Sequence, residues 1–184
     1  MADSQHCYIA LLRSINVGGH SVIRMPDLRG LFESLGLTEV VTYIQSGNVL
    51  FTSTDGDRGH LAKLLEKKLE SALGYRVPVF IFTRKQLEEA AAKNPFDPER
   101  KDKEQHCHLM FLSEEPDPEH CSELMAMEGR EYKFHIRGKV LYYAYSREFE
   151  GSGRRTINFE KVLGVTGTAR TWKVVRKLLE LSCK

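Results

Sequence analysis

The pattern of apolar and polar positions divides the first half of the chain into short strands and amphipathic helices. Short β-branched and aromatic runs are typical of strands, whereas leucines repeated every three or four residues are typical of a buried helix face. Pro26 suits the first turn of one helix, and Gly36 and Gly74 are stop signals. The runs predict a strand at 6–15, a helix at 25–36, a hairpin of 39–45 with 48–54, a helix at 60–73 and a strand at 77–83.

The same order of elements, β-α-β-β-α-β, recurs in the second half of the chain. Between the halves, Thr83 and Gln86 form a capping-box pattern that predicts a connecting helix, and Asn94-Pro95 ends it. We expect Thr156 to cap a short helix in the second half. The second set consists of a strand at 106–112, a helix at 116–127, a hairpin of 131–137 with 140–146, a short helix at 156–164, an edge strand at 166–170 and a final helix from 171.

This order of elements predicts an α+β fold made of two tandem ferredoxin-like (α/β plait) units. Each unit is close to the lower size limit for an independent core, so we expect the two to pack together. We place the first unit at 1–83, a connecting helix and loop at 84–104, and the second unit with its C-terminal helix at 105–184.

Composition narrows the class of protein. Of the 184 residues, 41% are apolar and 28% are charged, as in an ordinary globular domain. No apolar run approaches the roughly 18 residues of a membrane span, and the N-terminal residues lack the basic segment of a secretory signal. The four cysteines are scattered without a CxxC pair, so we expect reduced thiols. These features favour a cytoplasmic protein without a membrane partner or a cofactor.

Positive charge is concentrated near the C-terminus. From residue 151 onward the chain has eight lysines or arginines and two glutamates, a net +6 within an overall +2. The motif GSGRRT places two glycines and two arginines before a predicted helix N-terminus, an arrangement suited to phosphate. The alternative is a solvated loop and helix face. The candidate anion-binding residues are Arg154, Arg155, Arg170 and Lys173.

A second candidate site follows the first strand, in the motif RSINVGGH. Gly18 and Gly19 would let backbone N–H groups approach an anion, with Arg13 as a fixed cation and Asn16 as a polar reader. The motif is neither a dinucleotide-binding fingerprint nor a phosphate-binding P-loop. A long structural loop, with glycines at positive φ, is the alternative.

The hairpin motif TYIQSGN carries the third candidate set. Ser46-Gly47 has the chemistry of a tight turn, and a turn there would pair Tyr43 with Leu50 and Gln45 with Asn48. Opposed carboxamides would bond each other or a ligand's amide or base edge. In a plait the hairpin turn need not lie near the 13–20 loop. The ligand-binding candidates from both motifs are Arg13, Asn16, Gly18, Gly19, Tyr43, Gln45, Ser46 and Asn48.

Two motifs in the second half have weaker functional readings. With Gly138-Lys139 as the turn of the second hairpin, one sheet face would carry three basic side chains and an aromatic, as in sheets that stack RNA bases. A solvated face is the alternative. The run HCH puts His106 and His108 on one strand face, but its spacing matches no zinc site, so we expect no metal. The residues of the basic face are Lys133, His135, Arg137 and Tyr142.

The segment YIALLRSINVGGHSVIRMPDLRGLFESLGLTEVVTYIQSGNVLF closely resembles the start of the bacterial family called domain of unknown function 1697. The motifs NPF, FL and EKVLGVTGTARTW extend the resemblance over nearly the whole chain. Ser14 stands where members usually have glycine, and the residues from Arg170 to Val174 stand where the usual pattern is close to R-N-W-N-T. The resemblance implies a pair of α/β plaits and no assigned activity.

Taken together, these motifs favour a non-enzymatic binding protein whose ligand is a nucleotide or a nucleic acid. The basic C-terminal segment and the GSGRRT motif are the main reasons. A small enzyme with a polar site between the two units is the first alternative, although its candidate residues include no obvious general base. A structural or interaction protein without a small ligand is the second, and the sequence indicates no particular protein partner.

Overall fold

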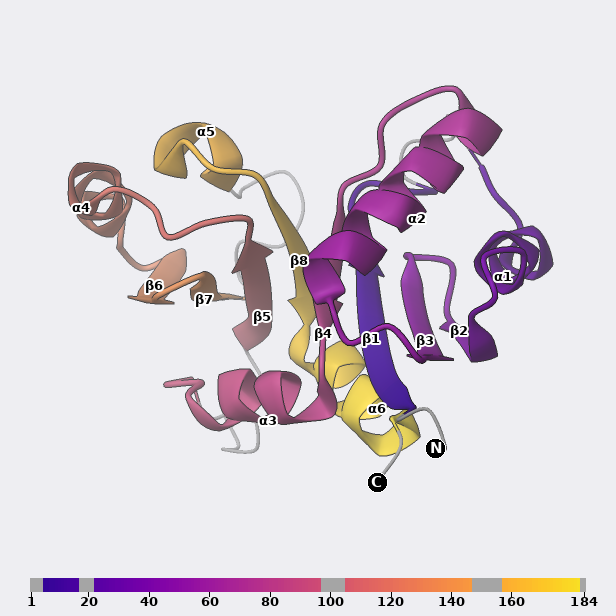
Figure 1. The fold of residues 1–184 in the computed structure, drawn as a ribbon. Coiled ribbons are helices and arrows are strands. Elements are labelled where there is room, and N and C mark those ends of the chain that lie inside the picture. The colour runs from indigo at the N-terminus through magenta and orange to yellow at the C-terminus, as the bar shows by residue number, and fades with distance from the viewer. Residues whose placement is uncertain (1–4, 17–21, 97–104, 147–156, 183–184) are drawn as a thin grey trace. The chain divides into compact units, whose positions relative to one another are not determined.

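The computed structural model describes residues 5–16, 22–96, 105–146 and 157–182. The fold is α+β, as expected, and the described residues form two four-stranded antiparallel sheets and six helices (Figure 1). The chain forms two compact units, one of Met1–Glu89 with Lys177–Lys184 and the other of Ala90–Arg176. The connecting helix and the C-terminal helix are therefore each divided between the two units. The boundaries predicted from the sequence placed neither helix in the first unit.

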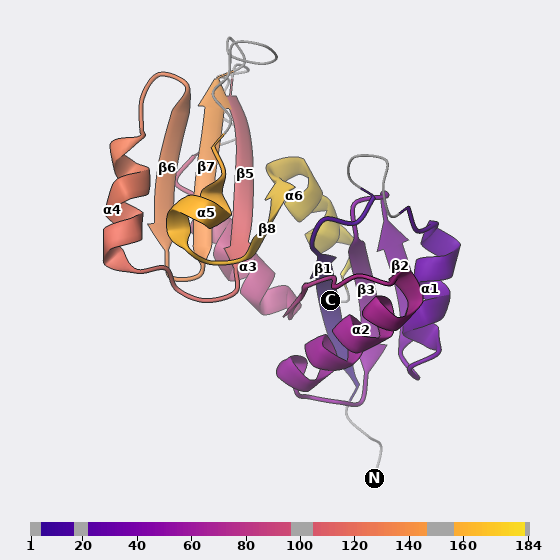
Figure 2. The same ribbon diagram turned by 90° about the horizontal axis from the view of Figure 1, so that it is seen from above.

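The first unit has the sheet order β2-β3-β1-β4, with helices α1 and α2 on one face (Figure 2). β4 lies at a sheet edge, the position that Pro78 predicts, because proline cannot donate to a strand ladder. The elements are β1 (His6–Leu12), α1 (Met25–Glu33), β2 (Thr38–Tyr43), β3 (Asn48–Ser53), α2 (Arg58–Leu73) and β4 (Val79–Phe82).

Strand alternation builds the core of the first unit. Tyr8, Ala10 and Leu12 of β1 point towards the helices and are 3% exposed or less. The rings of Phe32 on α1 and Phe51 on β3 meet edge to face at 5.6 Å. The residues of β1 that alternate with these therefore lie on the opposite face of the sheet, which α1 and α2 do not cover.

Helix ends in the first unit follow the sequence signals. Asp57 caps α2 by accepting hydrogen bonds from two backbone N–H groups of the first turn, and Gly74 ends the helix with φ of 79°. The capping box is confirmed: the backbone N–H of Thr83 donates to the Gln86 side chain (3.0 Å), and the backbone N–H of Gln86 donates to Thr83 Oγ1 (3.3 Å).

The second unit has the sheet order β6-β7-β5-β8, with α4 and α5 on one face (Figure 2). Asn158, not Thr156, caps α5, because its side chain accepts from the backbone N–H of Lys161 (3.1 Å). Thr156 lies outside the described residues. The remaining elements are α3 (Arg84–Ala92), β5 (Gln105–Leu112), α4 (Pro118–Ala126), β6 (Tyr132–Arg137), β7 (Val140–Ser146), α5 (Phe159–Leu163), β8 (Gly167–Thr171) and α6 (Trp172–Leu181).

The strand register predicted from the sequence is correct for the second hairpin and incorrect for the first. The second has the predicted two-residue turn, with Ile136 opposite Leu141. The prediction for the first is wrong, because Tyr43 pairs with Asn48 rather than with Leu50. Its turn has four residues, 44–47, and Gly47 has φ of 72°. The Gly47 carbonyl accepts a hydrogen bond from the backbone N–H of Leu12 (2.8 Å), which holds the longer turn against β1.

Tyr142 contradicts the expected base-stacking face. Its side chain is 1% exposed, and its hydroxyl donates to the carbonyl of Ala90 (2.9 Å) near the end of α3. Burial raises the pKa of Tyr142 above its ordinary value. A buried ring cannot stack on a base, and His135 on the same face accepts a hydrogen bond from Arg137 Nε (2.8 Å).

We expect Tyr142→Phe to lower the free energy of unfolding of the second unit by about 1–3 kcal/mol, because it leaves a buried carbonyl of the last helical turn without its donor. Urea unfolding followed by circular dichroism measures the change. Tyr43→Phe is the control, since Tyr43 is only partly buried. A loss no larger than that of the control would mean that the Tyr142 hydroxyl contributes nothing.

The cysteines do not all match the expectation of reduced thiols. Cys107 and Cys121 are free, whereas Cys7 is disulfide-bonded, so the expectation is wrong for Cys7. Cys183 lies outside the described residues. None of the helices in the described ranges combines the length and the apolar character needed to cross a membrane.

Candidate functional site

Asn16 closes the loop that follows β1. Its side-chain oxygen accepts from the backbone N–H of Ile23 (2.8 Å), and its Nδ2 donates to the carbonyl of the same residue (3.1 Å). These two bonds tie the end of β1 to the segment before α1. Gly18 and Gly19, the predicted anion-binding glycines, lie within this loop and outside the described residues.

The same asparagine brings the two motifs of the first unit together. Asn16 Nδ2 also donates to the carbonyl of Gln45 (2.9 Å), in the turn between β2 and β3. No local signal in the sequence predicts this contact between residues 29 positions apart. β1 and β3 are antiparallel neighbours, so the end of β1 lies beside the start of β3, with Leu11 opposite Asn48. The loop and the turn therefore share one end of the sheet.

Asn48 is a structural residue of this end. It is 0% exposed, and its Nδ2 donates to the carbonyl of Tyr43 (3.1 Å) and to Ser46 Oγ (2.9 Å). Buried polar groups are normally bonded in this way, because an unmet donor is costly. The carboxamide thus fixes the turn from inside, and Gln45 does not face it across the hairpin.

The outer surface of this sheet end carries small polar groups and one apolar side chain. Gln45 and Ser46 are exposed, Tyr43 is half-buried, and Ile44 is 48% exposed. Arg13 is half-buried at the end of β1, where its backbone N–H donates to the carbonyl of Pro78 (3.0 Å). The segments 13–16 and 43–48 contain no carboxylate, imidazole or thiol.

Backbone strain is concentrated at the same sheet end. Among the described residues other than glycine, four have positive φ, and three of them lie here: Ser14 (56°), Asn16 (56°) and Ile44 (48°). A β-branched residue such as isoleucine is uncommon in this region of backbone space. Such conformations cost on the order of 1–3 kcal/mol each, and they are found at binding and catalytic sites more often than elsewhere.

Of the four predicted anion-binding residues of the C-terminal segment, the structure describes Arg170 and Lys173. Arg154 and Arg155 lie outside the described residues. Arg170 is 7% exposed, with Nη1 donating to Thr168 Oγ1 and to the carbonyl of Ala169 (both 2.8 Å), and burial lowers its pKa to about 10. Lys173 is exposed on α6. Both of these Arg170 bonds tie the buried guanidinium to other residues of β8.

The model of the family described as "Protein of unknown function (DUF1697)" matches residues 6–142, which include both motifs of this sheet end. The chain belongs to this family. A search of curated proteins finds no match. The DUF1697 chain and a conserved bacterial protein from Streptococcus pneumoniae share a fold, with a TM-score of 0.75 over 96% of this chain and 98% of the other, at 23% identity. A protein of unknown function from Galdieria sulphuraria aligns with a TM-score of only 0.26 at 16% identity, over 91% of this chain and 99% of the other.

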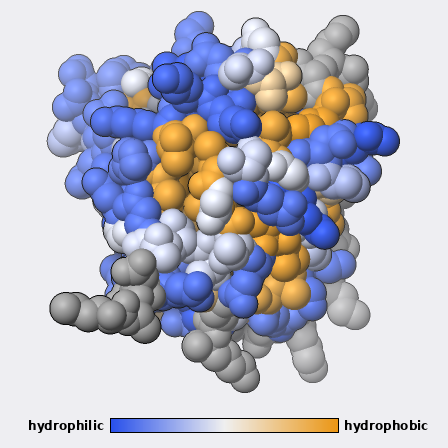
Figure 3. All heavy atoms as spheres, turned by 45° about the vertical axis from the view of Figure 1, so that its right-hand side comes forward, coloured by the Kyte–Doolittle hydropathy of each residue, from blue (hydrophilic) through white to orange (hydrophobic). Residues whose placement is uncertain are grey.

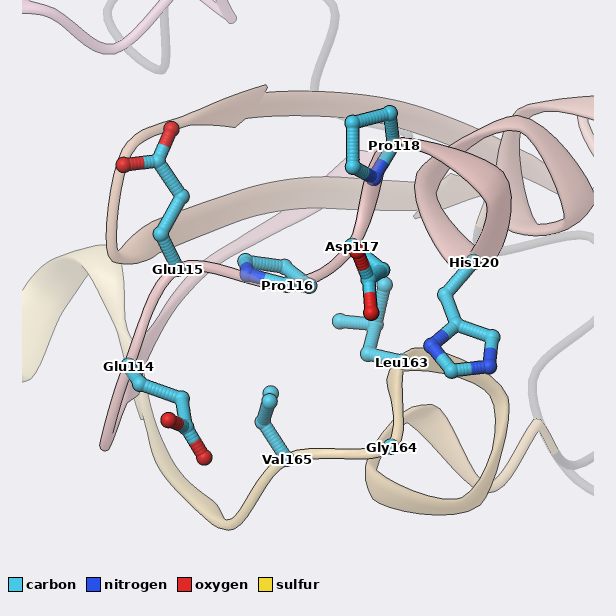
Figure 4. A pocket seen from close by; sticks show the side chains of 9 residues that line it. All are labelled: Glu114, Glu115, Pro116, Asp117, Pro118, His120, Leu163, Gly164 and Val165. Atoms are coloured by element: carbon cyan, nitrogen blue, oxygen red, sulfur yellow. The ribbon is translucent and has the colours of Figure 1, made fainter.

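The second unit of the DUF1697 chain has an acidic groove of about 500 Å³ between α4, α5 and the loop before α4 (Figure 4). Glu114, Glu115 and Asp117 line it, with His120 at one side. Figure 4 shows these side chains pointing in different directions rather than at one point. Within the described ranges, no group of three or more His, Cys, Asp or Glu side chains is placed to hold a metal ion.

The histidines of the HCH run have aromatic partners. The ring of His108 stacks on Tyr143 with ring centres 4.8 Å apart and planes 6° apart, and His106 lies 5.0 Å from Tyr145. Tyr143 and Tyr145 of β7 therefore pack their rings against the two histidine rings of β5.

A cavity of about 240 Å³, which no sequence motif indicates, lies in the first unit on the sheet face that α1 and α2 leave open. Its polar lining includes Glu39, Thr52 and Arg84. In the sequence, Glu39 has the pattern of an ordinary exposed strand residue. Nothing near it in the sequence indicates the irregular backbone that sets the direction of its side chain.

Apolar side chains also reach the surface in several places among hydrophilic ones (Figure 3). Within the described residues, the large exposed ones are Val22, Val41, Ile44, Met125 and Leu181.

Proposed function

We propose that this DUF1697 protein is a non-enzymatic binding protein for a phosphate-bearing ligand, a nucleotide or a nucleic acid. The binding surface is the end of the first sheet where the 13–16 loop meets the 44–47 turn. One observation carries the proposal: the bond from Asn16 to the Gln45 carbonyl joins the two most distinctive motifs of the chain.

The side chains of this surface suit recognition better than catalysis. The Arg13 guanidinium matches phosphate oxygens, and the exposed Gln45 carboxamide can donate to and accept from a base edge. The segments supply no carboxylate, imidazole or thiol to act as a general base or nucleophile. Loops at strand ends, held by a rigid sheet, are common positions for binding residues.

Strain at this surface supports the proposal. Ile44 is exposed, apolar and held at positive φ, so the fold maintains a conformation that the residue itself disfavours. Asn16 and Asn48 supply the bonds that hold it there. The exposed Gln45 and Ser46 are consequently presented in a fixed geometry, which lowers the entropy lost on binding.

We also propose that both units are ferredoxin-like plaits. The strand orders β2-β3-β1-β4 and β6-β7-β5-β8 are the same order in two sets of elements, each read as β-α-β-β-α-β along the chain. In each set the two helices between the strands cover one face of the sheet. The repeated topology is the support for this assignment.

The test is a binding titration with ATP, GTP and a short single-stranded RNA at about 50 and 150 mM salt. We expect at least one probe to bind, with affinity falling as salt rises. At a hundredfold its Kd, the probe stabilises the protein by about 2.7 kcal/mol in a thermal-shift assay. Arg13→Ala and Gln45→Ala should each weaken binding about tenfold.

Arg29→Ala is the matched control, since it removes an exposed arginine from the outer side of α1 in the same unit. Its affinity should equal that of the parent protein. Absence of binding to all three probes at low salt would overturn the proposal. Binding that survives both site variants but is lost in Arg154→Ala/Arg155→Ala would move the site to the basic C-terminal segment.

A further inference from the structure

The cavity on the open face of the first sheet is built from two rows of side chains with opposite character. The first row crosses the sheet through directly paired residues: Val41 lies opposite Leu50, and Leu50 lies opposite Ile9. Ile9 and Leu50 are buried, whereas Val41 is 45% exposed at the edge. These three aliphatic side chains form an apolar floor with one open end.

The second row is polar. Thr52 lies opposite Cys7, and its hydroxyl donates to Glu39 Oε2 (2.8 Å). Thr52 is 2% exposed, so its hydroxyl is held inside the cavity rather than in solvent. The carboxylate of Glu39 therefore stands beside the apolar floor, with its position fixed by a hydrogen bond.

An irregularity in β2 puts Glu39 in this position. The register of β2 against β3 shifts between Thr38 and Val41, and Glu39 has φ of 50°. Bulges of this kind redirect a side chain relative to the regular alternation of a strand. A glutamate at positive φ in a strand is uncommon, and it costs free energy that regular pairing would not. The irregular backbone thus places the Glu39 side chain where regular strand alternation would not.

The opposite wall is formed by the start of α3 and the end of α6, both in the first unit here. Arg84 Nη1 donates to the carbonyls of Leu179 (2.7 Å) and Ser182 (3.0 Å), where a cation complements the helix C-terminus. Arg84 Nε donates to Glu88 (2.7 Å). The charge of Arg84 is thus already paired outside the cavity.

Among the charged side chains that line the cavity, Glu39 is exposed and forms no ion pair with another described residue. The charged side chains among the lining residues are Glu39 and Arg84, and Arg84 has Glu88 as its partner. Oε2 of Glu39 accepts from Thr52, while Oε1 has no hydrogen-bond partner among the described residues. A carboxylate oxygen beside an apolar floor favours a cationic donor on a small apolar body.

We propose that this cavity binds a small amphipathic amine. The protonated amine donates to Glu39 Oε1, and the apolar body lies on Val41, Leu50 and Ile9. The volume of about 240 Å³ exceeds the roughly 150 Å³ of a cavity that holds benzene, so it accommodates a ring with a short chain. This site shares no side chain with the sheet end assigned to a phosphate-bearing ligand and is independent of that proposal.

The test is an NMR titration of the folded protein with 2-phenylethylamine, compared with the neutral 2-phenylethanol and the anionic phenylacetate. For a probe of this size we expect a Kd on the order of a millimolar. Amide shifts should move at residues 7–9, 39–41 and 50–52 and stay constant at 13–16 and 45–47. The alcohol should bind about tenfold more weakly than the amine, and phenylacetate not at all.

Glu39→Gln keeps the size and the hydrogen-bonding capacity of the side chain while removing its charge. It should weaken amine binding about tenfold and leave the alcohol unchanged. Glu33→Gln, an exposed carboxylate on α1, is the matched control and should change neither. Equal binding of amine and alcohol would overturn the proposal, as would unchanged amine binding in Glu39→Gln. Absence of amide shifts at 39–41 would also overturn it, provided that the amide spectrum shows a folded protein.

Discussion

Gly47→Ala is expected to lower the free energy of unfolding of the first unit by about 2–5 kcal/mol. The new Cβ would lie 2.8 Å from Leu12 Cβ and 2.9 Å from Ile15 Cγ1, closer than carbon atoms approach in folded proteins. Both neighbours are buried and cannot move aside without opening the core. The φ of 72° adds the left-handed penalty of about 1–2 kcal/mol for a residue with a side chain, and overpacking adds about 1–3 kcal/mol.

Gly74→Ala separates the two contributions to this loss. Gly74 has nearly the same φ, 79°, but a Cβ there meets nothing within 4 Å. Its loss should therefore be the backbone penalty alone, about 1–2 kcal/mol. Urea unfolding of both variants followed by circular dichroism gives the difference. If Gly47→Ala loses no more stability than Gly74→Ala, the close approach of the turn to the end of β1 is not a constraint.

Asn48→Ala is expected to lower the free energy of unfolding by about 2–4 kcal/mol. The substitution removes both donated hydrogen bonds of a fully buried carboxamide, leaves the Tyr43 carbonyl without this donor and opens a small cavity. A loss of this size would show that the asparagine of the TYIQSGN motif is retained for folding rather than for contact with a ligand.

Gln45→Ala provides the comparison for Asn48→Ala, because it removes a carboxamide of the same hairpin that is exposed. Exposed substitutions of this kind usually change stability by less than about 0.5 kcal/mol. The two variants should therefore differ clearly in urea unfolding, and the one with the small effect is suitable for binding experiments. Equal, small losses would contradict the structural role of Asn48.

The order of elements could be predicted from the sequence because it depends on local signals. Apolar periodicity placed the strands and helices, the Thr83–Gln86 capping box marked the start of α3, and Gly74 marked the end of α2. The two-residue turn at Gly138-Lys139 set the register of the second hairpin. Each of these signals involves residues close together in the chain, and the α+β class follows from their sum.

Features that depend on distant residues could not be predicted in the same way. The first hairpin has a longer turn because Gly47 bonds to Leu12, which lies on another strand. The burial of Tyr142 depends on the end of α3, 52 residues away along the chain. The shift of register at Glu39 has no local sequence mark. Contacts between separated segments account for the first two of these features, which no local sequence signal could predict.

The first unit is discontinuous in the chain, since residues 177–184 belong to it and 90–176 do not. During synthesis the ribosome delivers β1 to β4 first, yet the carbonyls that Arg84 binds, at Leu179 and Ser182, emerge only after the whole second unit. Arg84 and Leu179 are separated by 95 residues. The wall of the cavity opposite Glu39 is therefore the last part of the first unit to form, and it forms after the rest of the protein can already have folded.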